Sequence, residues 1–364
     1  MENPFDLVTL LSSTVAAGAS DLHLSADSPP MVRINGGLAA LGERAMTVDL
    51  CRDMINGILT EAQRARLEEE WELDFAIQVD GIGRFRGNAH YSRSALEAAF
   101  RYIPQTIPEL GGLGHRASIF EICSRRRGLV LVTGITGSGK STTMASMIQH
   151  ISRQINGIII TVEDPVEYVF QNARSLVKQR EVGSDTKSFR EALRHALRQD
   201  PDVILVGEMR DPETIGAAIT AAETGHLVIA TLHTIDAPKA IDRMVDAFPG
   251  DQQPQIVAQL ANSLEAVISQ RLIPREDGAG RVLVSETLSA NPGVRACIRE
   301  RRWEQLVGLI EIGAKDGMHT IDDDLAGLYL SGAISREEAV TNARDRQRIE
   351  QLEREAPKKK GIFG

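Results

Sequence analysis

The chain up to about residue 105 alternates between apolar and polar positions in the way expected of a half-exposed sheet. Residues 50–59 and 61–70 instead have apolar side chains at helical spacing. Asp80-Gly81 separates two alternating segments and is a strong hairpin signal. The pattern predicts a small α+β domain with an antiparallel sheet. Its expected strands are 21–25, 31–34, 71–79, 83–91 and 96–103.

After residue 114 the pattern changes to apolar runs of strand length that alternate with amphipathic helices. This rhythm predicts an α/β fold with a doubly wound parallel sheet. The expected order is strand 129–133, helix 141–155, strand 157–162, helix 188–198 and strand 203–206, and from about residue 293 the pattern is helical. We therefore predict a first domain at 1–104, a linker rich in proline and glycine at 105–114, an α/β core at 115–292, a helical C-terminal region at 293–350 and a disordered tail at 351–364.

Length and composition agree with a globular protein of two domains. The chain has 364 residues, of which 42% are hydrophobic and 25% charged. It has neither an apolar run of membrane-spanning length nor a signal peptide, so we expect it to stay in the compartment where it is made. The cysteines Cys51, Cys123 and Cys297 are too widely spaced to indicate a disulfide framework or a zinc site.

Charge argues against nucleic acid as a partner. The formal net charge is −9 and aromatic residues make up only 4% of the chain. Nucleic-acid motors typically carry a basic stripe and stacking aromatics. We therefore expect no nucleic-acid partner.

Residues 134–141 fit the pattern G-x-x-x-x-G-K-S, between an apolar strand and a helix. Glycines let successive N–H groups turn toward phosphate oxygens, and the helix N-terminus adds its positive end. Lys140 is expected to reach the β- and γ-phosphates, and Ser141 to ligate Mg²⁺. The predicted ATP-binding residues are Gly134, Ile135, Thr136, Gly137, Ser138, Gly139, Lys140, Ser141 and Thr142.

Hydrolysis of a bound nucleotide also needs carboxylates, which hold the metal ion and position the attacking water. Two carboxylates follow apolar strands in this sequence. Glu208 follows the strand 203–206, and Glu163 follows the strand 157–162. In parallel sheets such ends lie at one edge, beside the phosphate loop. We expect Glu208 to hold Mg²⁺ through water and Glu163 to be the base that orients the attacking water. The alternative for Glu163 and Asp164 is that they cap a turn before Pro165, and the division of roles between the two glutamates stays open.

His226 and His233 flank another apolar strand. Their spacing is not that of metal ligands. Two interpretations remain open: ordinary loop histidines, or sensors of the γ-phosphate.

Taken together, these motifs resemble those of the secretion ATPases of type II and type IV pilus systems, and most closely the pilus-retraction ATPases of twitching motility. The resemblance extends from about residue 5 to 345. The segments that carry it are 19–25, the hairpin 81–86, the phosphate loop, the acidic stretch 161–168, the strand with its acidic end 201–211 and the histidine-flanked strand 222–233.

The resemblance implies a PAS-like N-terminal domain followed by a RecA-like P-loop ATPase domain. It further implies a homohexameric ring with ATP and Mg²⁺ at each subunit interface. Arg84, Arg86 and Arg101 of the N-terminal domain would complete the site and compensate charge on the transferred phosphoryl group. The alternative is that these arginines are ordinary side chains of a half-exposed sheet.

Retraction is favoured over extension by two features. The extension ATPases usually carry a further N-terminal domain and a four-cysteine zinc module, whereas this chain has neither pattern. Residues 293–300 resemble a C-terminal motif associated with retraction, with departures at Gly293, Val294, Ala296 and Cys297. The expected coupling residues are Arg295, Ile298, Arg299 and Glu300. An amphipathic surface helix is the alternative for this stretch.

The resemblance also implies a place and partners. It predicts a cytoplasmic protein, peripheral at the inner face of the cytoplasmic membrane, that contacts an inner-membrane pilus platform protein, with a second retraction ATPase as a further partner. Two other functions stay open: a DNA-translocating motor, which the charge opposes, and a non-hydrolysing accessory subunit, which Lys140, Glu163 and Glu208 oppose.

Overall fold

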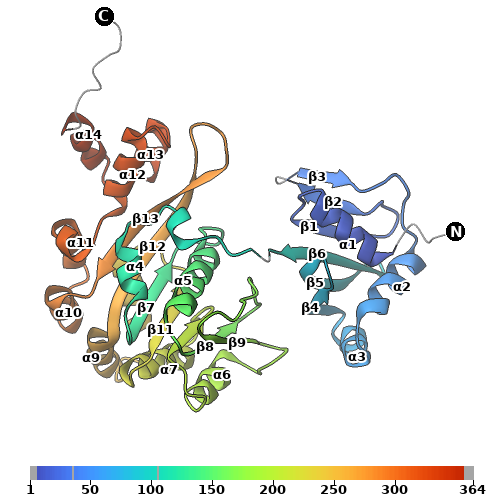
Figure 1. Cartoon of the computed structure of the whole chain (residues 1–364), viewed down its shortest axis with the longest axis horizontal. Helices are drawn as coiled ribbons and strands as arrows, with labels where there is room; N and C mark the ends of the chain where they lie inside the picture. The colour runs from blue at the N-terminus through green and yellow to red at the C-terminus, as the bar shows by residue number, and fades with distance from the viewer. Residues whose placement is uncertain (1–5, 35–36, 105, 356–364) are drawn as a thin grey trace, which may run out of the picture. The chain divides into compact units, whose positions relative to one another are not determined.

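A computed structural model describes residues 6–34, 37–104 and 106–355 (Figure 1). The chain divides between Thr106 and Ile107 into two compact units. No helix in these described ranges is both long enough and apolar enough to cross a membrane.

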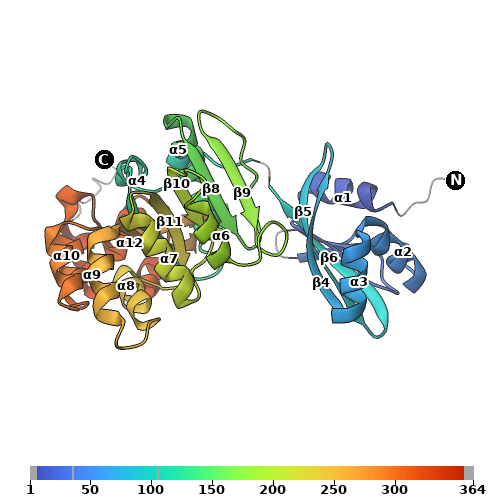
Figure 2. The ribbon, with the colours of Figure 1, turned by 90° about the horizontal axis from the view of Figure 1, so that it is seen from below.

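The first unit is an antiparallel sheet with helices on one face. Among the described residues its strand order is β3-β2-β1-β6-β5-β4, with every neighbouring pair antiparallel. Figure 2 shows the three helices on the same side of this sheet, where they bury a core that includes Phe85 and Phe100. The α+β fold with an antiparallel sheet is as predicted. The elements are α1 (Leu7–Ala16), β1 (Asp21–Leu24), β2 (Met31–Ile34), β3 (Gly37–Ala40), α2 (Val48–Ile58), α3 (Glu61–Glu70), β4 (Glu72–Val79), β5 (Gly83–Ser92) and β6 (Ala95–Ile103).

The second unit contains a sheet whose order, over the described residues, is β13-β12-β7-β11-β10-β8-β9. All neighbouring pairs are parallel except β12 with β13. β7, β10 and β11 are buried along their whole length, as their apolar sequences require in a parallel sheet covered on both faces. The strands are β7 (Gly128–Thr133), β8 (Ile158–Glu163), β9 (Leu176–Glu181), β10 (Val203–Val206), β11 (Leu227–Leu232), β12 (Leu264–Pro274) and β13 (Arg281–Ser289).

Helices cover both faces of this sheet. Figure 2 shows α4 and α5 on one side and α7 and α8 on the other, and each layer has its own buried apolar cluster. The helices are η1 (Leu110–Gly112), α4 (Ser118–Cys123), α5 (Lys140–Gln154), α6 (Phe189–Ala196), α7 (Pro212–Glu223), α8 (Ala237–Asp246), α9 (Gln253–Ser263), α10 (Pro292–Arg299), α11 (Gln305–Ile312), η2 (Ala314–Asp316), α12 (Ile321–Leu330), α13 (Arg336–Asn342) and α14 (Arg346–Glu355).

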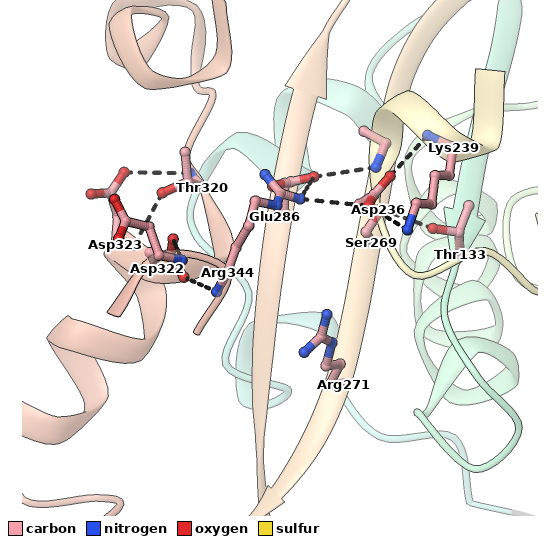
Figure 3. Close-up of polar contacts among 12 residues, drawn as sticks. Thr133, Asp236, Lys239, Ser269, Arg271, Glu286, Thr320, Asp322, Asp323 and Arg344 are labelled. Carbon is pink, nitrogen blue, oxygen red and sulfur yellow. Dashed lines mark hydrogen bonds and ion pairs between the residues drawn. The ribbon is translucent and has the colours of Figure 1, made fainter. Parts of the chain in front are cut away.

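An ion-pair cluster joins the C-terminal helices to the sheet (Figure 3). Glu286 on β13 is fully buried and pairs at 2.9 Å with Arg344, which lies between α13 and α14. Arg344 also lies 4.0 Å from Asp236, the N-cap of α8. The backbone N–H groups of Arg344 and Asp345 donate to the Asp322 carboxylate at 2.7 and 3.0 Å. A buried carboxylate needs such partners. The cluster therefore ties the last helices to the start of α8.

Four sequence predictions need correction. The segment from Ile107 to residue 114, predicted as linker, belongs to the second unit, where Ile107 and Leu110 are buried and the Pro108 carbonyl accepts from Ser146 on α5. The predicted tail begins too early, because α14 continues through Glu355; residues 356–364 lie outside the described residues. The sheet is not wholly parallel. Strands β3, β9, β12 and β13 were not predicted; β3 and β9 are short and largely exposed, which gives weak periodicity.

Candidate nucleotide site

The predicted phosphate loop joins the carboxyl end of β7 to α5. Gly134 and Gly139 have backbone φ angles of 147° and 90°, values that residues with a side chain rarely adopt. A Cβ on Gly134 would lie 2.4 Å from the carbonyl oxygen of Gln270, so only glycine fits there. α5 begins at Lys140, directly after the loop, and the unpaired N–H groups of its first turn lie at the same place. The exposed tip at 135–137 and this helix start form a cradle for an anion.

Lys140 and Glu208 bring opposite charges to this loop. The Lys140 ammonium donates to the carbonyl oxygens of Gly134 and Ile135 at 2.8 and 3.0 Å. Burial lowers the pKa of Lys140, and the charge of Glu208 acts in the opposite direction. β7 and β10 are both parallel to β11, so Glu208, just after β10, lies at the same edge of the sheet as the loop that follows β7.

Glu208 is held by two basic side chains. Arg210 lies 2.7 Å and the Nε2 of His233 lies 3.1 Å from its Oε1. Burial raises the pKa of Glu208, but the hydrogen bonds and charges of Arg210 and His233 outweigh burial and leave the pKa below its usual value. Glu208 is therefore an ionised carboxylate at neutral pH.

Glu163 ends β8, the strand next to β10, and is only 8% exposed. Thr161 donates to its Oε1 at 2.6 Å and Gln179 donates to the same oxygen at 3.1 Å. Burial raises the pKa of Glu163, although these hydrogen bonds and the Glu167 N–H oppose the shift. A carboxylate with a raised pKa is suited to accept a proton.

Sequence reasoning missed several side chains that support the site. Gln270 on β12 is buried and donates to the Ser138 carbonyl of the loop at 2.8 Å. The hydroxyls of Thr142 and Tyr168 lie 2.9 Å apart. A buried glutamine inside the apolar run of β12 was the available signal, because a buried amide requires partners.

The two histidines lie at opposite ends of one strand. His233 follows the carboxyl end of β11 and contacts Glu208, whereas His226 precedes β11 and its carbonyl accepts from the Gly128 N–H at the start of β7. The Nδ1 of His226 lies 3.0 Å from the carbonyl oxygen of Ala221. Within its own chain, His233 therefore lies beside Glu208, whereas the whole of β11 separates His226 from the loop.

The three predicted arginines lie in the first unit, on the sheet face opposite its helices. Arg84 and Arg86 alternate with buried residues of β5, and Arg86 is directly opposite Arg101 on β6. Arg101 pairs with the buried Asp21 at 2.8 Å, and Arg86 lies 3.9 Å from Asp74. The phosphate loop belongs to the second unit. The three arginines thus share one face of the sheet in the first unit, whereas the phosphate loop is part of the second unit.

The predicted coupling residues divide into packed and exposed ones. Arg295 donates to the carbonyl oxygens of Ala261 and Asn262 and pairs with Glu265 at 2.8 Å. Ile298 is fully buried in the core on that side of the sheet. Arg299 is exposed and donates to the Asn262 side chain, and the exposed Glu300 pairs with Arg302. Arg295 and Ile298 are therefore structural in their contacts, and only Arg299 and Glu300 face solvent.

Comparisons with known proteins place the chain in a family. Residues 107–322 match the family described as Type II/IV secretion system protein. The chain is 45% identical over 344 residues to the "Type IV pilus retractation ATPase PilT" of Pseudomonas aeruginosa, covering 94% of this chain and 98% of that protein. It is 42% identical to the "Twitching motility protein" of Neisseria gonorrhoeae, covering 94% and 91% of the two chains. The "Crystal Structure of the Pilus Retraction Motor PilT and Bound ADP" matches with a TM-score of 0.90 and 46% identity, over 95% of this chain and 99% of the other.

Proposed function

Because the chain belongs to the family of type II/IV secretion system proteins, we propose that it is an ATP-hydrolysing motor that drives type IV pilus retraction and hence twitching motility. The similarity to a named retraction ATPase over nearly the whole of both chains is what carries this function. The phosphate loop and the two strand-end glutamates supply the chemistry that such a motor needs.

In this proposal the backbone of 134–139 and Lys140 hold the β- and γ-phosphates. The donor set suits Mg²⁺, which prefers oxygen ligands and is usually bound by one or two protein oxygens together with phosphates and waters. Ser141, in the first turn of α5, and the ionised Glu208 would hold the ion, Glu208 through water. Bound there, Mg²⁺ would neutralise charge on the phosphates during transfer.

Glu163 is proposed as the base for the attacking water. Its carboxylate is buried, its pKa is raised, and it lies at the strand end next to that of Glu208. His233 is proposed to sense the γ-phosphate through its contact with Glu208. A proton removed from water would pass to the Oε2 of Glu163, whose Oε1 already accepts two hydrogen bonds.

The motor is proposed to work as a homohexamer. Arg84, Arg86 and Arg101 would reach the nucleotide of a neighbouring subunit, where positive charge stabilises the transferred phosphoryl group. The proposed location is the cytoplasmic face of the inner membrane, against a pilus platform protein, with a second retraction ATPase as a further partner. Arg299 and Glu300 are the exposed members of the coupling stretch and are proposed to face that machinery.

Two substitutions test the division of labour in the site. Lys140→Ala should weaken ATP binding by about 10- to 100-fold, because a charge-assisted contact to phosphate is lost. Glu163→Gln should bind ATP with near-normal affinity but lower kcat by about 100-fold or more, because the amide cannot accept the proton. Glu223→Gln, an exposed position at the C-terminal end of α7, is the matched control and should change neither quantity.

The readouts are ATP affinity and steady-state hydrolysis of the purified protein. Near-normal turnover of Glu163→Gln would contradict the role of Glu163 as the base. Asp164 and Glu208 would then be the next candidates for that role. In host cells, replacement of the gene by the Glu163→Gln allele should leave excess surface pili and no twitching. Normal twitching with that allele would argue against the motor function.

A further inference from the structure

Gln179 lies on β9, at the edge of the sheet and beside the strand that carries Glu163. β8 and β9 are parallel, and Gln179 is the register partner of Thr161. Thr161 and Glu163 are two positions apart on β8, so their side chains leave the same face of the sheet as that of Gln179. The three side chains therefore meet at the carboxyl edge of the sheet.

Their hydrogen bonds treat the two oxygens of Glu163 differently. Oε1 accepts from Thr161 at 2.6 Å and from Gln179 at 3.1 Å. Oε2 accepts from the Glu167 N–H over 3.4 Å, which is a long hydrogen bond. The carboxylate is thus fixed in rotation, with Oε1 fully occupied and Oε2 as the oxygen left to receive a proton.

Gln179 also holds the segment that follows Glu163. Its amide nitrogen donates to the Tyr168 carbonyl at 2.8 Å, and its amide oxygen accepts from the Phe170 N–H at 2.9 Å. The Tyr168 hydroxyl in turn lies 2.9 Å from that of Thr142, in the first turn of α5. Gln179 and Tyr168 together therefore connect the Glu163 carboxylate with the start of the phosphate-loop helix.

We propose that Gln179 is a positioning residue for ATP hydrolysis, which orients the Glu163 carboxylate through Oε1 and fixes its distance from the phosphate loop through Tyr168 and Thr142. This inference rests on the proposed role of Glu163 as the base. We assign Gln179 no contact with the nucleotide or with the attacking water. Gln179 affects turnover by holding Glu163 in place, because even a small displacement of a catalytic group lowers the rate of the reaction.

The test is a double-mutant cycle in the full-length protein. Gln179→Met keeps the bulk of the side chain but removes both its donor and its acceptor. It should lower kcat about 10- to 100-fold with ATP affinity within about 2-fold of wild type. In the Glu163→Gln background the same substitution should lower kcat no further, because residues that act as a unit are not additive.

Asn172→Ala is the matched control. The Asn172 amide oxygen accepts a hydrogen bond from the N–H of Val177, which lies on β9 as Gln179 does, at 2.9 Å. The variant therefore loses a hydrogen bond to β9 that does not involve Glu163. It should keep near-normal kcat. Gln179→Glu is the second variant, for use if Gln179→Met does not fold; it keeps the acceptor for Phe170 but sets a carboxylate against Glu163, and should also lower kcat at least 10-fold.

Three results would overturn the inference: near-normal kcat in Gln179→Met or Gln179→Glu, an equal loss in Asn172→Ala, or full additivity with Glu163→Gln. If Glu163→Gln alone keeps normal turnover, the proposed base is wrong and this inference falls with it. If Glu163→Gln is inactive while Gln179→Met is normal, only the role of Gln179 is rejected.

Discussion

Glu163 and Glu208 are the same residue type at neighbouring strand ends, yet their surroundings shift their pKa values in opposite directions. Burial raises the pKa of Glu163 against its hydrogen bonds. Burial also acts on Glu208, but Arg210 and His233 outweigh it and lower its pKa. Two carboxylates with pKa values pushed apart suit different tasks. This contrast supports Glu163 as the group that takes up a proton and Glu208 as the charged one.

Two histidines of the second unit make its stability depend on pH. Burial lowers the pKa of His115 to about 4. Burial, together with the charge of Arg116, lowers the pKa of His319 to about 3. In the unfolded chain a histidine has a pKa of about 6.5. Below that pH the unfolded chain binds protons that the folded chain does not, so stability must fall as the pH decreases.

We predict that the free energy of unfolding decreases from pH 7.5 to pH 5, by up to about 1.4 kcal/mol per pH unit for each of these histidines. Urea denaturation of the full chain at several pH values measures it. The double variant His115→Gln/His319→Gln should show a weaker pH dependence than the wild type over this range. If the free energy of unfolding of the double variant depends on pH as strongly as that of the wild type, His115 and His319 are not the groups responsible.

At the scale of elements, the contacts of α10 explain why the coupling stretch is not a free surface. The Arg295 guanidinium binds two carbonyls at the C-terminal end of α9 and the Glu265 carboxylate at the start of β12. Those carbonyls have no partner within their own helix, and a cation there is favourable. Arg295 thus joins two helices and the sheet, whereas Arg299 makes a single exposed contact.

The two arginines should therefore behave differently. Arg295→Ala should lower the free energy of unfolding by about 1.5–3 kcal/mol, because charge-assisted hydrogen bonds are lost. Arg299→Ala should change it by less than about 0.5 kcal/mol. Denaturation curves of the two variants give the comparison.

Arg299→Ala is accordingly the cleaner probe of coupling. We expect it to keep ATP hydrolysis and to abolish twitching in host cells. Normal twitching would show that Arg299 does not transmit force to the pilus machinery. The counterpart with Arg295→Ala would be uninformative, since loss of stability alone would impair motility.

At the scale of the whole molecule, the phosphate loop and the arginine-bearing sheet belong to separate compact units. Each unit has its own apolar core, and the first unit presents Arg84, Arg86 and Arg101 on the face without helices. In the proposed motor, ATP binding and hydrolysis would move these two units as bodies. A shared site between subunits would use that arrangement.

Mixed oligomers test the shared site. Arg84→Ala/Arg86→Ala should lower turnover on the order of 10³-fold with little loss of ATP binding, if these residues act as arginine fingers. Mixed with Glu163→Gln subunits, they should regain activity, because some interfaces then combine an intact Glu163 with intact arginines. No recovery in rings shown to be mixed would contradict sites built from two subunits.

The sequence by itself determined the fold class, the phosphate loop and the strand-end glutamates. These features are local: a buried parallel strand reads as a continuous apolar run, and Gly134 and Lys140 act within one strand–loop–helix unit. The position of Glu163 and Glu208 at one edge followed because parallel strands end together. Short or exposed strands such as β9 were missed, since their periodicity is weak.

Only the tertiary structure decided which side chains meet. His233 contacts Glu208 while His226 lies a strand length away, although both flank β11 in the same way along the sequence. Gln179 reaches Glu163 because β9 pairs with β8, and Arg295 is occupied because α9 ends beside α10. Strand order, register and helix packing set such contacts between segments far apart in the chain. No local pattern encodes them, because a hydrogen bond depends on where its partner is brought by the rest of the fold.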